Sequence, residues 1–110
     1  MTTLRILLIL FCLAGFQALG SNPVFIEPPQ YAVAGSVNGI AVGDFNGDGK
    51  LDLAVTCGLG YSPGVVSILL GNGDGTFQKH VDYEVGTAPV GIAVGDFNGD
   101  GKLDLAVANS

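Results

Sequence analysis

Apolar and small or polar residues alternate along several short stretches of the chain. Leu51, Leu53 and Val55 are each separated by one polar or small residue, and Ile40 and Val42 show the same spacing. A period of two is typical of β-strands that bury one face. No window shows a helical period flanked by capping signals. The pattern therefore predicts an all-β protein.

Glycine-rich sequences separate these stretches. Gly-Asn-Gly-Asp-Gly at 71–75 lies between the apolar run 65–70 and the segment 76–83. Asn-Gly and Asp-Gly steps supply the positive φ angles of tight hairpin turns, so we predict a hairpin here. Asn72 and Asp74 are weak metal ligands by themselves, because calcium takes about six to eight oxygens and only one carboxylate is present.

The alternating pattern belongs to an internal repeat. The sequence GIAVGDFNGDGKLDLAV at 39–55 recurs at 91–107, an offset of 52 residues. This offset exceeds that of the common helical repeats and is near the length of a β-propeller blade, about 40 to 50 residues. Propellers close with about four to eight blades. Because the chain holds fewer than two repeats, we expect a fragment of a larger propeller; the alternative is that several short chains assemble one.

The beginning of the chain has the layout of a secretory signal peptide. Arg5 precedes the apolar run 6–14, and Ala18-Leu19-Gly20 precedes Ser21. Gly15 and Gln17 interrupt the run before it reaches the roughly 20 apolar residues of a membrane-spanning helix. We therefore expect a secreted or cell-surface protein with no membrane span after cleavage. The expected divisions are a signal peptide at 1–20, a lead-in at 21–35, a first repeat at 36–87 and the truncated start of a second at 88–110.

The chain is acidic, and most of its carboxylates are concentrated in two short segments. Without residues 1–20 the chain has three Lys, no Arg and ten Asp or Glu, a formal charge of −7. A nucleic-acid partner is disfavoured, since such proteins bind phosphates through clustered Lys and Arg. Six of the ten acids lie in the two copies of one short loop. This concentration suggests a bound cation.

Within each loop, oxygen-bearing side chains occupy positions 1, 3, 5 and 9, and glycines occupy positions 4 and 6. A glycine at position 6 permits the sharp turn that directs the carbonyl of position 7, Lys50 or Lys102, at an ion. Such an oxygen-only set favours calcium over magnesium or zinc. The side chains are Asp44, Asn46, Asp48 and Asp52 in the first loop and Asp96, Asn98, Asp100 and Asp104 in the second.

Two simpler interpretations account less well for the loops. An ordinary Asp/Asn/Gly turn does not need three acids in nine residues, and two carboxylates about 5 Å apart repel by about 1 kcal/mol in water and about 3 kcal/mol at a dielectric near 20. An EF-hand needs flanking helices and a Glu at position 12, where this chain has Val55 and Val107. A dockerin-like module would also need helices.

The sequence DFNGDGKLDL, preceded by GIAVG and separated from its copy by VSILLGNGDGTF, resembles the FG-GAP/VCBS repeat family, whose members resemble blades of integrin α-subunit propellers. The resemblance implies calcium ligands at the eight side chains above and at the carbonyls of Lys50 and Lys102. It also implies a non-catalytic module for adhesion or for binding protein or carbohydrate. Gly35-Ser36-Val37-Asn38 departs from the family's Gly/Ala/Pro start, so the first blade is expected to be an edge or degenerate blade.

The alternative function is an appendage or part of an extracellular enzyme acting on polysaccharide or lipid. It would need a catalytic constellation outside the loops. His80, the single histidine, is interpreted as a surface residue on a half-exposed strand rather than a general base. Cys57 is expected to be buried and inert. Phe45 and Phe97 are expected to anchor their loops to the core.

Overall fold

The computed structural model describes residues 3–5, 29–59 and 62–110. Within these ranges the regular structure consists of strands and turns, and every paired strand is antiparallel to its neighbour. The predicted all-β fold is therefore confirmed. In the same ranges, no helix has the length and apolar character needed to span a membrane.

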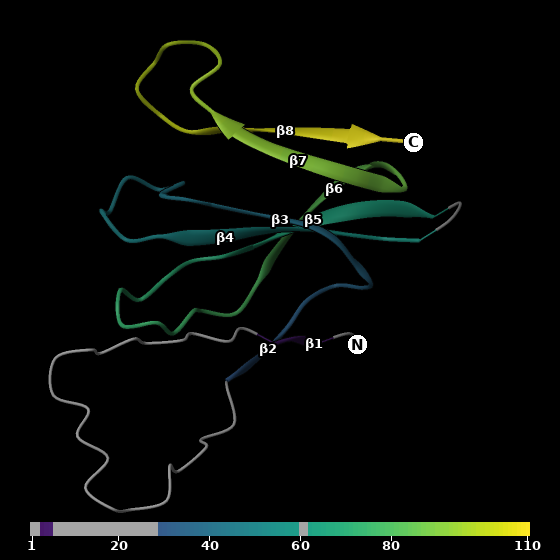
Figure 1. Cartoon of the computed structure of the whole chain (residues 1–110), viewed down its shortest axis with the longest axis horizontal. Coiled ribbons are helices and arrows are strands. Elements are labelled where there is room, and N and C mark those ends of the chain that lie inside the picture. The colour runs from purple at the N-terminus through teal and green to yellow at the C-terminus, as the bar shows by residue number, and fades with distance from the viewer. Residues whose placement is uncertain (1–2, 6–28, 60–61) are drawn as a thin grey trace, which may run out of the picture.

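A four-stranded sheet forms the centre of the molecule (Figure 1). Each strand pairs with the next one along the chain, which is the meander of a propeller blade. The first repeat is expected to form an edge or a degenerate blade; its sheet has all four strands, so the degenerate alternative is wrong. The strands are β3 (Val37–Gly43), β4 (Asp52–Cys57), β5 (Pro63–Leu69) and β6 (Val81–Thr87).

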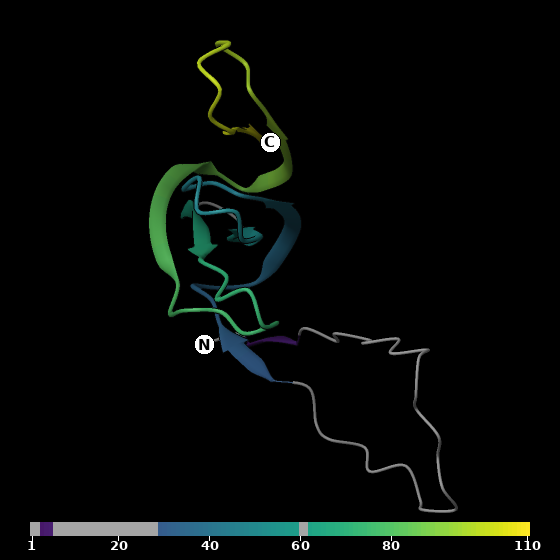
Figure 2. The ribbon, with the colours of Figure 1, turned by 90° about the vertical axis from the view of Figure 1, so that its left-hand side faces the viewer.

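The second repeat contributes a two-stranded sheet, β7 (Pro89–Gly95) and β8 (Asp104–Asn109). Its register reproduces that of the first repeat: Gly95 pairs with Asp104 as Gly43 pairs with Asp52. Identical sequence therefore gives identical strand pairing. β7 lies against β3, so the two sheets stack as neighbouring layers (Figures 1 and 2).

The N-terminal segment lies on the opposite side of the central sheet (Figure 2). There β2 (Gln30–Ala32) pairs with β1 (Thr3–Arg5). The expected signal peptide falls outside the described residues except for this short strand, and the expected lead-in is described only from residue 29.

The hydrophobic core lies between this segment and one face of the blade. Val33 is fully buried and packs against alternate residues of β4 and against Leu69. The Tyr31 ring meets Phe77 edge to face, with centroids 5.4 Å apart. The Tyr31 hydroxyl also accepts a hydrogen bond from the Phe77 backbone at 3.1 Å. The segment before the repeat therefore covers a sheet face that another blade would otherwise have to cover.

The other face of the blade meets the second repeat across an open apolar hollow of about 520 Å³. Leu105 and Val107 line it, and they occupy the repeat positions of Leu53 and Val55 in the first blade. The alternation read from the sequence therefore sets which side of each repeat is apolar. The hollow is completed by Phe45, Asn46, Val66, Ile68, Leu70, Tyr83, Val85 and Leu103.

The predicted hairpin joins β5 to β6. Gly73 and Gly75 have φ angles of 85° and 91°, and an isolated bridge pairs Gly71 with Phe77. The turn prediction is confirmed. The second strand begins at Val81, however, and not at Thr76.

Candidate metal centre

The first Asp-rich loop connects β3 to β4 and is curled around the carboxylate of Asp44. Oδ1 of Asp44 accepts hydrogen bonds from the backbone N–H groups of Gly47 at 2.8 Å and Asp48 at 3.1 Å. Oδ2 accepts one from Gly49 at 2.8 Å. Gly47 and Gly49 have φ angles of 75° and 81°, which only glycine adopts without strain. The glycines thus allow the backbone to wrap this carboxylate.

The second loop, between β7 and β8, repeats this arrangement. Oδ1 of Asp96 accepts from Gly99 at 2.9 Å and Asp100 at 3.1 Å, and Oδ2 accepts from Gly101 at 2.8 Å. All of these contacts span five residues or fewer. The local sequence is therefore sufficient to fix the shape of the loop.

The other candidate ligands near the loop apex also make the same contacts in both loops. Asn46 Oδ1 accepts from the Asp48 backbone at 3.2 Å, and Asp48 Oδ1 accepts from the Lys50 backbone at 2.9 Å. Asn98, Asp100 and Lys102 make the same two contacts at the same distances. These residues are exposed to solvent in both loops. An ion could therefore reach them from solution.

The backbone donors also act on the charge of Asp44. The Gly49 N–H, assisted by those of Gly47 and Asp48, lowers the pKa of Asp44 below its ordinary value, and this outweighs the raising effect of burial. A carboxylate held by several N–H donors stays ionised at neutral pH. This carboxylate therefore has the charge that a cation ligand needs.

Three carboxylates converge in the second loop. Oxygens of Asp96, Asp100 and Asp104 lie within 4.8 Å of one another, with the first two residues exposed and Asp104 partly buried. Hard oxygen donors of this kind suit calcium, which prefers carboxylate, amide and carbonyl ligands. The donor set of the second loop thus fits the ion that the sequence predicts.

The first loop does not bring its three carboxylates together in this way; among the described residues, the second loop alone forms such a group. Asp52 is fully buried. Its Oδ2 accepts from the Phe45 backbone at 2.9 Å, and its Oδ1 accepts from the Gly71 backbone at 2.8 Å. In the second loop, Asp104 Oδ2 accepts from the Phe97 backbone at 3.1 Å. Asp52 and Asp104 therefore have different surroundings in the structure, although they occupy the same position of the sequence repeat.

The loop phenylalanines differ as well. Phe45 is half-buried and lines the apolar hollow between the repeats. Phe97 is 62% exposed. The prediction that both rings anchor their loops is confirmed for Phe45 and wrong for Phe97, because the described chain places no further sheet beside the second loop.

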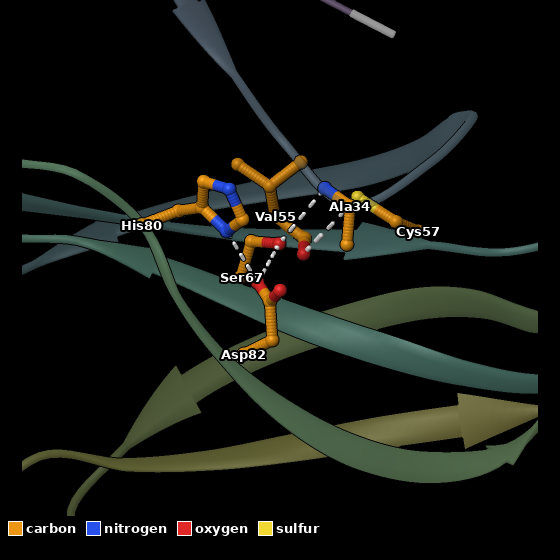
Figure 3. A network of polar contacts seen from close by, with 6 residues as sticks. All are labelled: Ala34, Val55, Cys57, Ser67, His80 and Asp82. Carbon is orange, nitrogen blue, oxygen red and sulfur yellow. Dashed lines mark hydrogen bonds and ion pairs between the residues drawn. The ribbon is translucent and has the colours of Figure 1, made fainter. Parts of the chain in front are cut away.

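His80 belongs to a polar network that sequence reasoning missed (Figure 3). Its Nδ1 lies 2.6 Å from Asp82 Oδ1, and the same oxygen accepts a hydrogen bond from the buried Ser67 hydroxyl at 2.6 Å. The His80 side chain is only 12% exposed and precedes β6. The prediction of a surface histidine on a strand is therefore wrong. The one sequence feature that could have indicated this contact is Asp82, two residues after His80.

The hydrogen bonds of this network differ from those of an activated serine nucleophile. A nucleophilic serine must hydrogen-bond its base, whereas Ser67 donates to Asp82 and not to His80. Burial acts to raise the pKa of Asp82, but the hydrogen bonds from Ser67 and His80 outweigh it and lower the pKa. The contacts connect β5 to the start of β6.

Cys57 is 1% exposed in the core, and its thiol lies 3.8 Å from the Val55 carbonyl oxygen. It is a free cysteine. Burial raises the pKa of the Cys57 thiol, which disfavours the reactive thiolate. The expectation of a buried cysteine is confirmed.

A family model described as an FG-GAP-like repeat matches residues 44–107. The match includes both loops and more than half of the chain. Neither the curated proteins nor the solved structures contain a significant match to the chain.

Proposed function

Since the chain belongs to the family of FG-GAP-like repeats, we propose that it is an exported, calcium-binding module that acts without catalysis in adhesion or in binding protein or carbohydrate. Repeats of this family build β-propeller-type domains and generally act as structural or binding modules. They occur mostly in extracellular or surface proteins. Export by cleavage of residues 1–20 is part of this proposal.

The convergence of Asp96, Asp100 and Asp104 within 4.8 Å carries the proposal. Three exposed or partly exposed carboxylates at this spacing repel one another unless a cation lies between them. The side-chain oxygen of Asn98 and the carbonyl of Lys102 would complete the protein ligands of the second loop. The same roles at the first loop would fall to Asp44, Asn46, Asp48 and the carbonyl of Lys50.

The ion would have a structural role. Each loop joins two paired strands, and in the second loop the candidate ligand Asp104 is the first residue of β8. A calcium ion held between the loop apex and the start of the strand would fix the loop and offset the carboxylate repulsion. In solutions rich in calcium this stabilises the folded state, because the unfolded chain lacks the site.

The partner in this proposal is an extracellular protein or carbohydrate. The acidic charge of the chain argues against nucleic acid, as the sequence already indicates. The His80 network gives no support to an enzymatic role, since its serine is buried and bonded to an acid.

Isothermal titration of the full chain with calcium, magnesium and zinc tests the proposal. We expect calcium to bind with a dissociation constant on the order of micromolar to millimolar, the range of sensors and extracellular modules, and more tightly than magnesium or zinc. Asp100→Ala should weaken this binding, whereas Asp74→Ala, in the β5–β6 hairpin, should not. Absence of calcium binding, or tighter binding of zinc, contradicts the proposal.

A further inference from the structure

We infer that the two loops, although identical in sequence, are inequivalent cation sites: Asp104 is a ligand in the second loop, whereas Asp52 in the first binds the backbone of the neighbouring hairpin. This inference rests on the calcium binding proposed above. It changes the role that the family resemblance implies for Asp52.

The Asp52 carboxylate accepts from two backbone donors and does not join Asp44 and Asp48 in a group of three acids. The Phe45 N–H comes from the loop itself, but the Gly71 N–H comes from the β5–β6 hairpin, 19 residues further along the chain. Asp52 is fully buried, and no described buried side-chain oxygen or nitrogen lacks a hydrogen-bond partner. A buried carboxylate in this position is stabilised by its two N–H donors.

The Gly71 donor has little freedom to move away. A Cβ atom at Gly71 would lie 1.9 Å from the carbonyl oxygen of Leu51, the residue before Asp52. The hairpin backbone is thus pressed against the start of β4. Turning Asp52 toward an ion would leave the buried Gly71 N–H without an acceptor, which is costly.

Asp104 has a different neighbourhood. It is partly exposed, and the backbone hydrogen bond it accepts is the one from Phe97 to Oδ2. β8 pairs only with β7, so in the described chain no hairpin reaches the position that Gly71 takes beside Asp52. Its carboxylate instead lies within 4.8 Å of Asp96 and Asp100.

The two loops should therefore bind calcium with different affinity. The second loop offers three carboxylates and the first offers two, and calcium affinity depends strongly on the number of charged ligands. Asp52, for its part, stabilises the protein even without calcium, because it joins the β3–β4 loop to the β5–β6 hairpin.

The matched variants Asp52→Asn and Asp104→Asn, made in the full chain, test this inference. We expect Asp104→Asn to weaken the tighter calcium site by about ten-fold or more, as the loss of one charged ligand implies, and to leave urea unfolding in chelator nearly unchanged. We expect Asp52→Asn to leave both affinities within about two-fold and to lower the urea midpoint in chelator, because its amide N–H₂ would face a backbone N–H. Equal loss of calcium affinity in the two variants overturns the inference.

A second pair of variants covers the case in which Asp52→Asn does not fold. Asp44→Asn/Asp48→Asn leaves only the second loop, and Asp96→Asn/Asp100→Asn leaves only the first; all four residues lie outside the core. Titration should give at least about ten-fold tighter calcium binding by the remaining second loop. Equal affinities contradict the inference while leaving the proposed function intact. If the wild-type chain binds no calcium, the proposed function fails. Urea unfolding of Asp52→Asn in chelator then still shows whether Asp52 stabilises the protein through its backbone contacts.

Discussion

The side-chain amide of Asn38 donates a hydrogen bond to the carbonyl oxygen of Pro89 at 2.8 Å, which joins the first strand of one repeat to the first strand of the next. The same amide donates to the Gly58 carbonyl oxygen at 2.6 Å, at the end of β4. Asn38 lies in the segment that departs from the family pattern. The departure therefore supplies a contact between the two repeats.

Replacement of Asn38 by Ala should lower the free energy of unfolding by about 1 to 2 kcal/mol, because both carbonyls lose a donor. Urea denaturation measures the change. Val90→Ala is the matched control, since Val90 occupies the same position in the second repeat and is 57% exposed; we expect a change within about 0.5 kcal/mol. Equal effects of the two substitutions would show that the contact adds nothing.

Calcium should raise the thermal stability of the chain. Ion binding to the folded state alone adds about 2.7 kcal/mol when free calcium is 100 times the dissociation constant. Differential scanning calorimetry in calcium and then in chelator should therefore show a clear rise in melting temperature. The rise should be smaller for Asp100→Ala. Superimposable melting curves for the wild-type chain would contradict a structural role of the ion.

The Tyr31 hydroxyl should contribute to the contact between the N-terminal segment and the blade. Tyr31→Phe removes the acceptor of the Phe77 N–H while keeping the ring contact, so we expect a loss of about 1 kcal/mol. Tyr83→Phe serves as the control because Tyr83 is 59% exposed. An unchanged urea midpoint for Tyr31→Phe would mean that the segment packs without this hydrogen bond.

Asp82 should make stability depend on pH in the acid range. Its pKa in the folded protein is lower than the ordinary value of 3.8. The contribution is therefore fully present above that value and is lost as pH falls through the folded-state pKa. Asp82→Asn should destabilise the protein near neutral pH and have a smaller effect at about pH 3. Urea unfolding across this range checks the trend, with the exposed Glu84→Gln as control. A loss that does not change with pH would exclude the charge as its cause.

Cys57 should react slowly with thiol reagents in the folded protein. Its side chain is 1% exposed, and burial raises the pKa of the thiol, so little thiolate is available. A Cys12→Ser variant leaves Cys57 as the single thiol. Its modification should be complete within minutes in urea and far slower without urea. Equal rates in the two conditions would contradict burial of Cys57.

Much of the fold follows from short-range features of the sequence. The alternation of apolar residues predicts the strands, and the repeat of 39–55 at 91–107 predicts two copies of one strand pair in the same register. The Asp and Gly positions also predict the loop shape, since Asp44 and Asp96 accept the same three backbone N–H groups. These contacts connect residues close in sequence, so equal sequences give equal structures.

The sequence by itself thus determined the all-β architecture, the repeat and the local form of the two Asp-rich loops. The tertiary structure alone decided how Asp52 differs from Asp104, because the Gly71 donor belongs to the β5–β6 hairpin, and among the described residues no such hairpin lies beside Asp104. It likewise decided the burial of Phe45 and the partners of His80. In each case the deciding contact comes from another strand or sheet, and a local pattern contains no information about which strand will lie there.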